Sequence, residues 1–251
     1  MWLGVWRLWR AVLHGVHGVL IVLWRFPLMS ETQRHDRIRW WSMAMLRCLG
    51  MELEVEGSIR PGGTLLVANH ISWLDIMAIH AVHPQARFVS KADVQSWPLV
   101  NRLVDCAGTL YIRREQRRDA MRAMHEMAQA LRDGQCVAVF PEGTTGSGRE
   151  LLPFHANLLQ SAIAVEAPVQ PVALRYRDQA HAISPAVEFL GQTTLAQSLW
   201  RVACGRGLVV RVMVLPARAS AHADRRSLAD LLRRDLAQAL EQGRCGSHTP
   251  A

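Results

Sequence analysis

Hydrophobic and polar positions divide this chain of 251 residues into two regions with different periodicity. In the first 50 residues, apolar side chains recur at helical steps of three and four, which predicts two helices separated near Pro27. From residue 51 onward, short apolar runs alternate with longer amphipathic segments. This alternation predicts one α/β domain, in which helices flank a mostly parallel or mixed central sheet.

Seven apolar or alternating runs are the expected strands of that sheet. They cover residues 53–59, 65–68, 87–91, 108–112, 136–140, 168–174 and 208–214. Helices are expected after residue 75, from residue 97, across Met121, Met124 and Met127 as far as Gly134, and from Ser227, the expected N-cap of the last helix. The expected units are a helical hairpin over residues 1–50, the α/β domain over residues 51–243 and a disordered tail over residues 244–251.

The hairpin is rich in tryptophan, with six of the chain's nine tryptophans among the first 41 residues. Its longest apolar run, Ala11–Trp24, has 14 residues, fewer than the roughly 20 that span a bilayer. Tryptophan and arginine on such a helix favour the headgroup boundary of a membrane. We therefore expect a membrane-anchoring hairpin in one leaflet, with two helices that only pack on the domain as the alternative. A signal peptide is disfavoured because no small-residue cleavage site follows Trp24.

The chain is basic, with a net charge of +8, and 28 of its 29 basic residues are arginine, the exception being Lys91. Arginine suits both phosphate groups and membrane surfaces. A nucleic-acid partner is disfavoured, because the arginines are scattered and no zinc-finger spacing or aromatic RNA-binding motif accompanies them. The five cysteines form no C-x-x-C pair, which favours reduced thiols in a cytosol-facing protein over disulfides or a cysteine zinc site.

The stretch Asn69–Asp75 carries the first candidate for chemistry. His70 is expected in the turn after the apolar run at 65–68, and Asp75 in the first turn of the helix that follows. The carboxylate would then fold back on the imidazole, fix its tautomer and raise the basicity of the other ring nitrogen, as a general base requires. By spacing alone, a surface histidine near an acidic helix terminus is the more common interpretation.

Two other expected strands also end in polar residues. Arg113 and Arg114 follow one strand, and Glu142 and Gly143 follow another. Ligands of open α/β sheets gather at the carboxyl ends of strands, so these residues and His70 are expected to converge.

Four blocks of the sequence resemble, in order, those of the glycerolipid acyltransferases, a family typified by 1-acylglycerol-3-phosphate O-acyltransferase. The blocks are NHISWLD at 69–75, GTLYIRR at 108–114, FPEGT at 140–144 and APVQPVAL at 167–174. The hairpin is also similar to the membrane anchor of bacterial members. The resemblance implies a single α/β acyltransferase domain preceded by a membrane-associated two-helix segment.

The resemblance also implies a mechanism. His70, oriented by Asp75, would deprotonate the hydroxyl of a lysolipid, which attacks the thioester of acyl-CoA or acyl-ACP. Backbone amides near the His70 turn are the expected oxyanion donors. The implied substrate-binding residues are Arg114, Glu142, Gly143, Thr144, Lys91 and Asn69, with Arg114 rather than Arg113 on the acceptor's phosphate. No cofactor beyond the acyl donor is implied, and no metal.

Two positions depart from the family's pattern. Thr145 stands where many lysophosphatidate enzymes have arginine, and His155 where lysine is common. The expected reaction is still acylation of 1-acyl-glycerol-3-phosphate to phosphatidate in phospholipid biosynthesis, at the cytoplasmic face of the inner membrane. Lyso-ornithine lipid or another lysolipid is the alternative acceptor, because relatives that use such acceptors tolerate a loop of this kind.

Other functional classes fit the sequence less well. Ser147, flanked directly by glycines, does not match the G-x-S-x-G elbow of serine hydrolases. His70, His80 and His83 lack the H-E-x-x-H arrangement of a zinc enzyme. A non-enzymatic peripheral membrane-binding module remains the alternative of another class.

Overall fold

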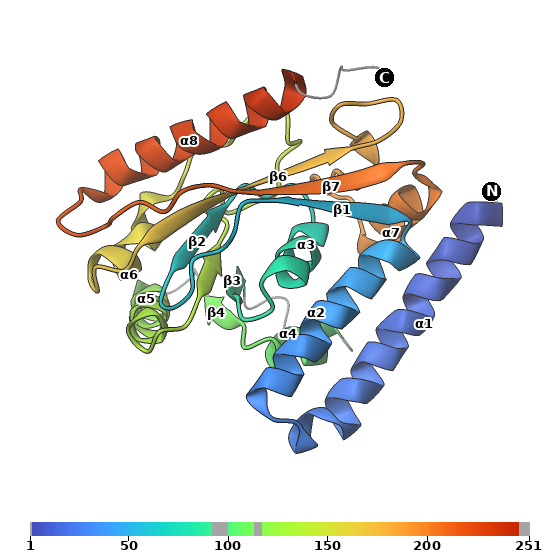
Figure 1. Cartoon of the computed structure of the whole chain (residues 1–251), viewed down its shortest axis with the longest axis horizontal. Helices are drawn as coiled ribbons and strands as arrows, with labels where there is room; N and C mark the ends of the chain where they lie inside the picture. The colour runs from blue at the N-terminus through green and yellow to red at the C-terminus, as the bar shows by residue number, and fades with distance from the viewer. Residues whose placement is uncertain (1, 92–99, 113–116, 246–251) are drawn as a thin grey trace.

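The computed structural model describes residues 2–91, 100–112 and 117–245, and a seven-stranded mixed sheet forms its centre (Figure 1). The strands are β1 (Met51–Glu56), β2 (Leu65–Ala68), β3 (Arg87–Lys91), β4 (Leu110–Ile112), β5 (Val137–Val139), β6 (Val169–Arg177) and β7 (Leu208–Val214). Their spatial order is β1-β7-β6-β2-β5-β3-β4. Each of the seven expected strands is present, and β1 lies at an edge of the sheet.

Neighbouring strands are parallel except for β6 and β7, which run antiparallel. The prediction of a mixed, mostly parallel sheet is therefore confirmed. Because β2, β5, β3 and β4 are parallel to their neighbours, their carboxyl ends share one edge of the sheet. The turn after β2 and the loop after β5, which carry His70 and Glu142, leave the sheet at this edge.

Helices cover both faces of the sheet, with α8 on one side and α2 and α3 on the other (Figure 1). They are α1 (Trp2–Trp24), α2 (Glu31–Cys48), α3 (Leu74–Val82), α4 (Val100–Cys106), α5 (Arg117–Arg132), α6 (Gln160–Ile163), α7 (Leu195–Cys204) and α8 (Arg225–Cys245), with 3-10 turns η1 (Phe26–Leu28), η3 (Ala156–Leu159) and η4 (Pro185–Val187). Each face has its own apolar core. One contains Leu46 of α2 and Leu74 of α3, and the other contains Met127 of α5 and Leu232 of α8.

The last helix begins earlier than the sequence predicted. Asp224 caps it, because its carboxylate accepts from the amides of Arg226 and Ser227 at 3.1 and 2.9 Å. The Ser227 hydroxyl only donates to the same carboxylate. The prediction of Ser227 as N-cap is wrong because a charged aspartate three residues earlier satisfies the helix amides and also complements the helix dipole. The helix continues to Cys245, and residues 246–251 of the expected tail lie outside the described residues.

The helix α7 was not predicted. Thr194 and Gln197 form a capping box at its start, and this Thr-x-x-Gln pattern is the sequence signal that could have revealed it. Its hydroxyl at Ser198 accepts from the Trp73 ring at 3.1 Å, so α7 packs beside the turn that carries His70.

The two N-terminal helices form the expected hairpin, joined by η1 (Figure 1). One reciprocal contact locks them together: the Trp41 ring donates to the His14 carbonyl at 3.1 Å, and the His14 ring donates to the Trp41 carbonyl at 2.9 Å. Gly18 lies so close to Trp41 that a side chain there would collide with the indole. The hairpin also packs on the domain, since Leu46 and Leu49 of this region belong to a core of the sheet.

The hairpin is fastened to α7 at its other end. The Arg7 guanidinium donates to the carbonyls of Gly205 and Ala203, at 2.5 and 3.4 Å, where α7 ends. These carbonyls lack partners within their helix, so a cation at this position is favourable.

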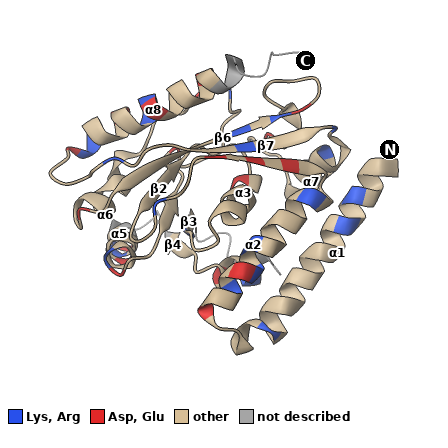
Figure 2. Ribbon diagram, in the orientation of Figure 1, with Lys and Arg blue, Asp and Glu red and all other residues tan. Residues whose placement is uncertain are grey.

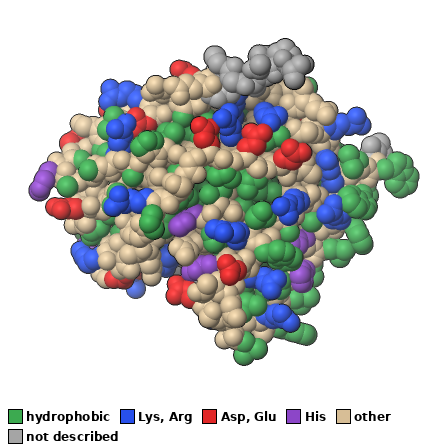
Figure 3. All heavy atoms as spheres, in the orientation of Figure 1, with side chains coloured by type: hydrophobic (Ala, Val, Ile, Leu, Met, Phe, Trp, Pro, Cys, Tyr) green, Lys and Arg blue, Asp and Glu red, His purple; other side chains and the backbone are tan. Residues whose placement is uncertain are grey.

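The outer face of α1 is apolar and exposed. Trp2, Trp6 and Trp9 expose 89%, 52% and 59% of their surface. Figure 3 shows hydrophobic side chains projecting along the edge that α1 forms, and Figure 2 shows that the charges on this helix are basic. Within the described residues, no helix combines the length and apolar character needed to cross a bilayer.

Candidate active site

His70 lies in the turn between β2 and α3, and Asp75 lies in the first turn of α3. The distance between His70 Nδ1 and Asp75 Oδ2 is 2.7 Å. A carboxylate oxygen accepts, so the proton of this bond belongs to Nδ1, and Nε2 is the ring nitrogen that accepts from other groups. The His70 side chain is 19% exposed whereas Asp75 is completely buried. The geometry therefore provides an oriented imidazole with one accessible basic nitrogen.

Four donors hold the Asp75 carboxylate. Besides His70, the amides of Ile71 and Ser72 donate to Oδ2 at 2.7 and 2.9 Å, and the Tyr176 hydroxyl donates to Oδ1 at 2.7 Å. Burial, together with the contact to this carboxylate, raises the pKa of Tyr176 well above its ordinary value. Sequence reasoning missed Tyr176, which lies on β6 and carries no local signal of this contact.

A second carboxylate, Glu142, holds the backbone of His70. Its two oxygens accept from the amides of His70 and Leu152, each at 2.9 Å. In return, the Gly146 amide donates to the His70 carbonyl at 2.7 Å. Burial raises the pKa of Glu142, although both amide hydrogen bonds oppose this shift. The loop after β5 thus bonds to both the amide and the carbonyl of His70. Phe140 of the same loop stacks on the imidazole, with ring centroids 4.0 Å apart.

The Asn69 side chain ties β2 to β6. It donates to the Leu174 carbonyl at 2.9 Å and accepts from the Leu174 amide at 2.7 Å, and it is buried. Both of its polar atoms bond to the backbone of Leu174, so this side chain holds the two strands together, and the predicted contact with substrate is not seen. The amides of His70, Ile71 and Ser72 all donate to carboxylates, so these three amides are not free to act as oxyanion donors, and donors near this turn stay a prediction.

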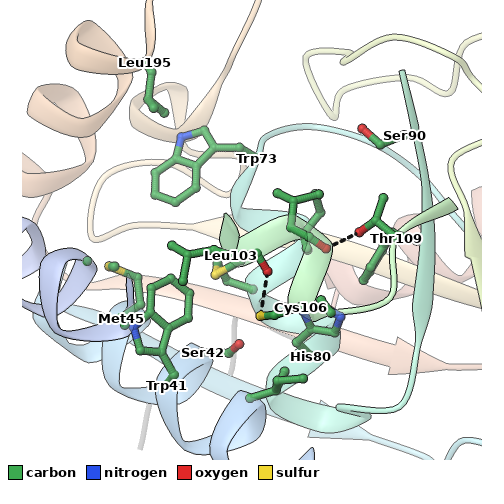
Figure 4. Close-up of a pocket in the computed structure, with 18 of the residues that line it drawn as sticks. Trp41, Ser42, Met45, Trp73, His80, Ser90, Leu103, Cys106, Thr109 and Leu195 are labelled. Atoms are coloured by element: carbon green, nitrogen blue, oxygen red, sulfur yellow. Dashed lines mark hydrogen bonds between the residues drawn. The ribbon is translucent and has the colours of Figure 1, made fainter. Parts of the chain in front are cut away.

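An apolar cavity of about 670 Å³ opens beside His70. The hairpin forms one wall with Trp41 and Met45, and Leu103 of α4 and Leu195 of α7 also line the cavity (Figure 4). Met77 of α3 and Leu199 of α7 complete this lining. Gly143, Thr144 and Thr145 line it after β5. A cavity of this volume with few polar groups fits a fatty chain. This lining could not be identified from the sequence, because it comes from segments between Ala11 and Leu199.

The remaining residues of the expected site lie on the same sheet edge or outside the description. Lys91 is the last residue of β3. Arg113 and Arg114 directly follow β4 and lie outside the described residues. Gly143 adopts a positive φ of 70°, a conformation that favours glycine and turns the loop towards the cavity. Thr144 is exposed at the cavity wall.

Comparison with known proteins supplies the family. An acyltransferase family model matches residues 52–175, which contain all four sequence blocks. The chain is 40% identical over 185 residues to the 1-acyl-sn-glycerol-3-phosphate acyltransferase of Neisseria meningitidis, covering 72% of this chain and 71% of that protein. The chain belongs to the glycerolipid acyltransferase family. It is therefore an acyltransferase, as the four blocks predicted.

Another relative of this acyltransferase is named for a different acceptor. The lyso-ornithine lipid O-acyltransferase of Pseudomonas aeruginosa is 37% identical over 206 residues, covering 82% of this chain and 79% of that protein. The crystal structure of the 1-acyl-sn-glycerophosphate acyltransferase of Thermotoga maritima superposes with a TM-score of 0.68 at 20% identity, covering 98% of this chain and all of that one. This likeness shows a common fold that includes the region of the hairpin.

Proposed function

We propose that this acyltransferase moves a fatty acyl group from acyl-CoA or acyl-ACP to the free hydroxyl of a lysolipid, with His70 as general base. The observation that carries the proposal is the oriented imidazole at the cavity wall, with Nδ1 bonded to Asp75 and Nε2 accepting. The lysolipid hydroxyl gives its proton to Nε2 as its oxygen attacks the thioester carbon. The C–S bond then breaks, and the departing thiolate takes the proton from Nε2, which leaves an ester and a free thiol.

The residues around His70 divide into positioning groups and substrate contacts. Glu142 acts through the His70 amide, and Asn69 acts by tying the end of β2, directly before His70, to Leu174 of β6. Gly143 and Thr144 line the cavity, so the loop that contains them is our candidate for the oxyanion donors and the acceptor contact. Arg114 and Lys91 remain the proposed ligands of the acceptor headgroup, since Lys91 ends β3 and the sequence reaches Arg114 shortly after the parallel neighbour β4 ends.

The preferred acceptor is 1-acyl-glycerol-3-phosphate, which would give phosphatidate. Supporting this choice are the arginine of the Gly-x5-Arg block, suited to a phosphate, and the name of the Neisseria meningitidis relative. The reaction needs no group beyond the two substrates in this scheme.

Lyso-ornithine lipid is the second candidate acceptor. Near the cavity, the Thr145 hydroxyl donates to the Phe189 carbonyl, and Arg149 pairs with Glu188 at 3.3 Å. This part of the loop therefore offers charges of both signs, which disfavours a phosphate relative to a headgroup that carries both an amine and a carboxylate. The Pseudomonas aeruginosa relative is named for such an acceptor.

The hairpin would bring the site to the lipid surface. Its outer tryptophans are exposed, and the Arg10 guanidinium lies 4.4 Å from the centroid of the Trp6 ring, a pairing suited to the headgroup region. The cysteines with described side chains are all free thiols, in keeping with a cytoplasmic face of the inner membrane.

One assay tests the function and separates the acceptors. The purified protein is given radiolabelled acyl-CoA or acyl-ACP, with lysophosphatidate or lyso-ornithine lipid as acceptor. We expect transfer to one acceptor to exceed transfer to the other and to disappear in His70→Ala. The control is His181→Ala, which removes an exposed histidine that pairs with Asp178 away from the cavity. Vesicle binding without transfer to any lysolipid would favour the membrane-binding module instead, and full activity of His70→Ala would refute the general base.

A further inference from the structure

The cavity is lined by a buried hydroxyl that the proposed reaction does not use. Ser42 of α2 lines the cavity, is 1% exposed, and its hydroxyl has no hydrogen-bond partner. Leaving a buried hydroxyl unsatisfied is unfavourable, so such a group at a cavity wall is a candidate position for a hydrogen bond to a ligand atom. Other polar groups at the same wall are already engaged: the Cys106 thiol donates to Leu103 and the Thr109 hydroxyl to Val104.

Ser42 lies away from the reacting end of the cavity. Figure 4 places it with His80 and Cys106, at the opposite end from Trp73 and Leu195. Trp73 and His80 mark the first and last turns of α3, which separates them by about 10 Å along the helix axis. A hydrogen bond supports this placement: Arg39, one turn before Ser42 on α2, donates to the carbonyl of Val82, where α3 ends. Ser42 therefore lies near the last turn of α3.

We infer that the cavity binds a fatty chain that carries a hydroxyl or oxo group remote from its carboxyl carbon, and that Ser42 is the residue that recognises it. The inference rests on the proposed acyl transfer and narrows its substrate class. A plain hydrocarbon chain would leave the Ser42 hydroxyl without a partner, whereas a chain oxygen at this depth would satisfy it. A hydroxyl next to the carboxyl group would lie near His70 and Trp73, too far from Ser42.

The chain with the polar substituent could belong to the donor or to the lysolipid, and the test separates these sources. One arm compares acyl-CoA donors of equal length that are unsubstituted, hydroxylated beside the carboxyl group, or hydroxylated in mid-chain, with an unsubstituted lysolipid. The other arm places the mid-chain hydroxyl on the lysolipid and keeps the donor unsubstituted. We expect kcat/KM to be roughly tenfold higher for the mid-chain hydroxyl in one of the two arms.

Ser42→Ala should abolish this preference and leave transfer of the unsubstituted chain unchanged or faster. The matched control is Thr109→Val, which removes a lining hydroxyl that is already bonded and should keep the preference. Ser42→Ala should also keep or raise the melting temperature, because it removes an unsatisfied group, whereas a serine with a structural role would lower it. Equal kcat/KM for all chains, or a preference that survives Ser42→Ala, overturns the inference while the proposed function stands.

If the protein transfers no acyl group, a fatty-acid binding measurement still tests the role of Ser42. Unsubstituted and mid-chain hydroxylated fatty acids then compete with a fluorescent fatty acid for the wild-type protein and for Ser42→Ala. Tighter binding of the hydroxylated acid to the wild type alone supports the inference even if the proposed transfer fails. Equal affinity in both proteins shows that water satisfies Ser42 and overturns it.

Discussion

The surroundings of His70 and the N-terminal hairpin are held together in different ways. Around His70, buried carboxylates at Asp75 and Glu142 accept from backbone amides and from Tyr176, so polar bonds set the position of each group. The hairpin has one reciprocal pair of hydrogen bonds at Trp41, close glycine packing, and an outer face of exposed tryptophan. We infer from this contrast that orientation of the base and contact with lipid belong to separate parts of the fold.

The strongest test of this separation is Asp75→Asn. The amide side chain of this variant would have only one oxygen to accept from the four donors that now hold Asp75. Its NH2 group would face the remaining donors, and if it pointed at His70 it would force the other imidazole tautomer. We expect kcat to fall by about 10³-fold or more, with vesicle binding unchanged in a sedimentation assay. Asp235→Asn, which weakens only the surface ion pair with Arg218, is the control. A kcat within tenfold of the wild type would mean that Asp75 does not orient the base.

The converse test removes two exposed tryptophans. In Trp6→Ala/Trp9→Ala, vesicle binding should weaken by roughly 100-fold, because each indole that enters the headgroup boundary contributes about 1.4 kcal/mol, or tenfold in affinity. Transfer between detergent-dispersed substrates should stay within about twofold. Trp200→Ala removes a tryptophan of α7 that is exposed to 40%, and serves as the control. Undiminished vesicle binding by the double variant would exclude this face as the membrane contact.

Two histidines of the β2–α3 unit, His70 and His80, also differ in how they are held. His70 has a carboxylate partner, whereas His80 at the other end of the cavity is buried and donates to the Ala86 carbonyl at 3.0 Å. Burial lowers the pKa of His80 to about 4, with smaller effects from His83 and His35, while the bond to Ala86 opposes the shift.

The unfolded chain therefore binds more protons than the folded protein between pH 6.5 and about 4. Stability from this group is present above pH 6.5 and is lost as pH falls, by up to about 3 kcal/mol. His80→Asn should flatten that part of the pH profile of the free energy of unfolding, measured with urea. The exposed His181→Ala should leave it unchanged, and an equal slope in His80→Asn and the wild type would contradict the assignment.

The smallest effect is expected from Tyr176→Phe. It removes one of the four donors to Asp75 and keeps the ring in the core, so we expect a loss of about 1–2 kcal/mol in stability and about tenfold in kcat. Tyr111→Phe is a matched control, because the chain's other tyrosine donates to exposed Asp105. The orienting role would be disproved by a kcat equal to that of the wild type despite a measurable loss of stability.

Much of the fold could be predicted because its signals are local. The apolar runs revealed each strand. The His70–Asp75 contact joins residues five apart, but spacing alone favoured a surface histidine, and the family's blocks were what pointed to the pair. Two helix starts were nevertheless predicted wrongly or not at all, although the sequence contains a local signal for each. Asp224 outcompeted Ser227 as a cap, and the capping box of Thr194 was overlooked.

The alternation of strands and helices and the family's four blocks are local features of the sequence, and one block contains both His70 and Asp75. The tertiary structure alone decided that Tyr176 donates to that aspartate and that Glu142 lies behind His70, contacts that join residues 101 and 72 positions apart. It also decided that the hairpin forms a wall of the cavity. The physical reason is that such contacts depend on the order of β6, β2 and β5 in the sheet, and strand order leaves no periodic trace in the sequence.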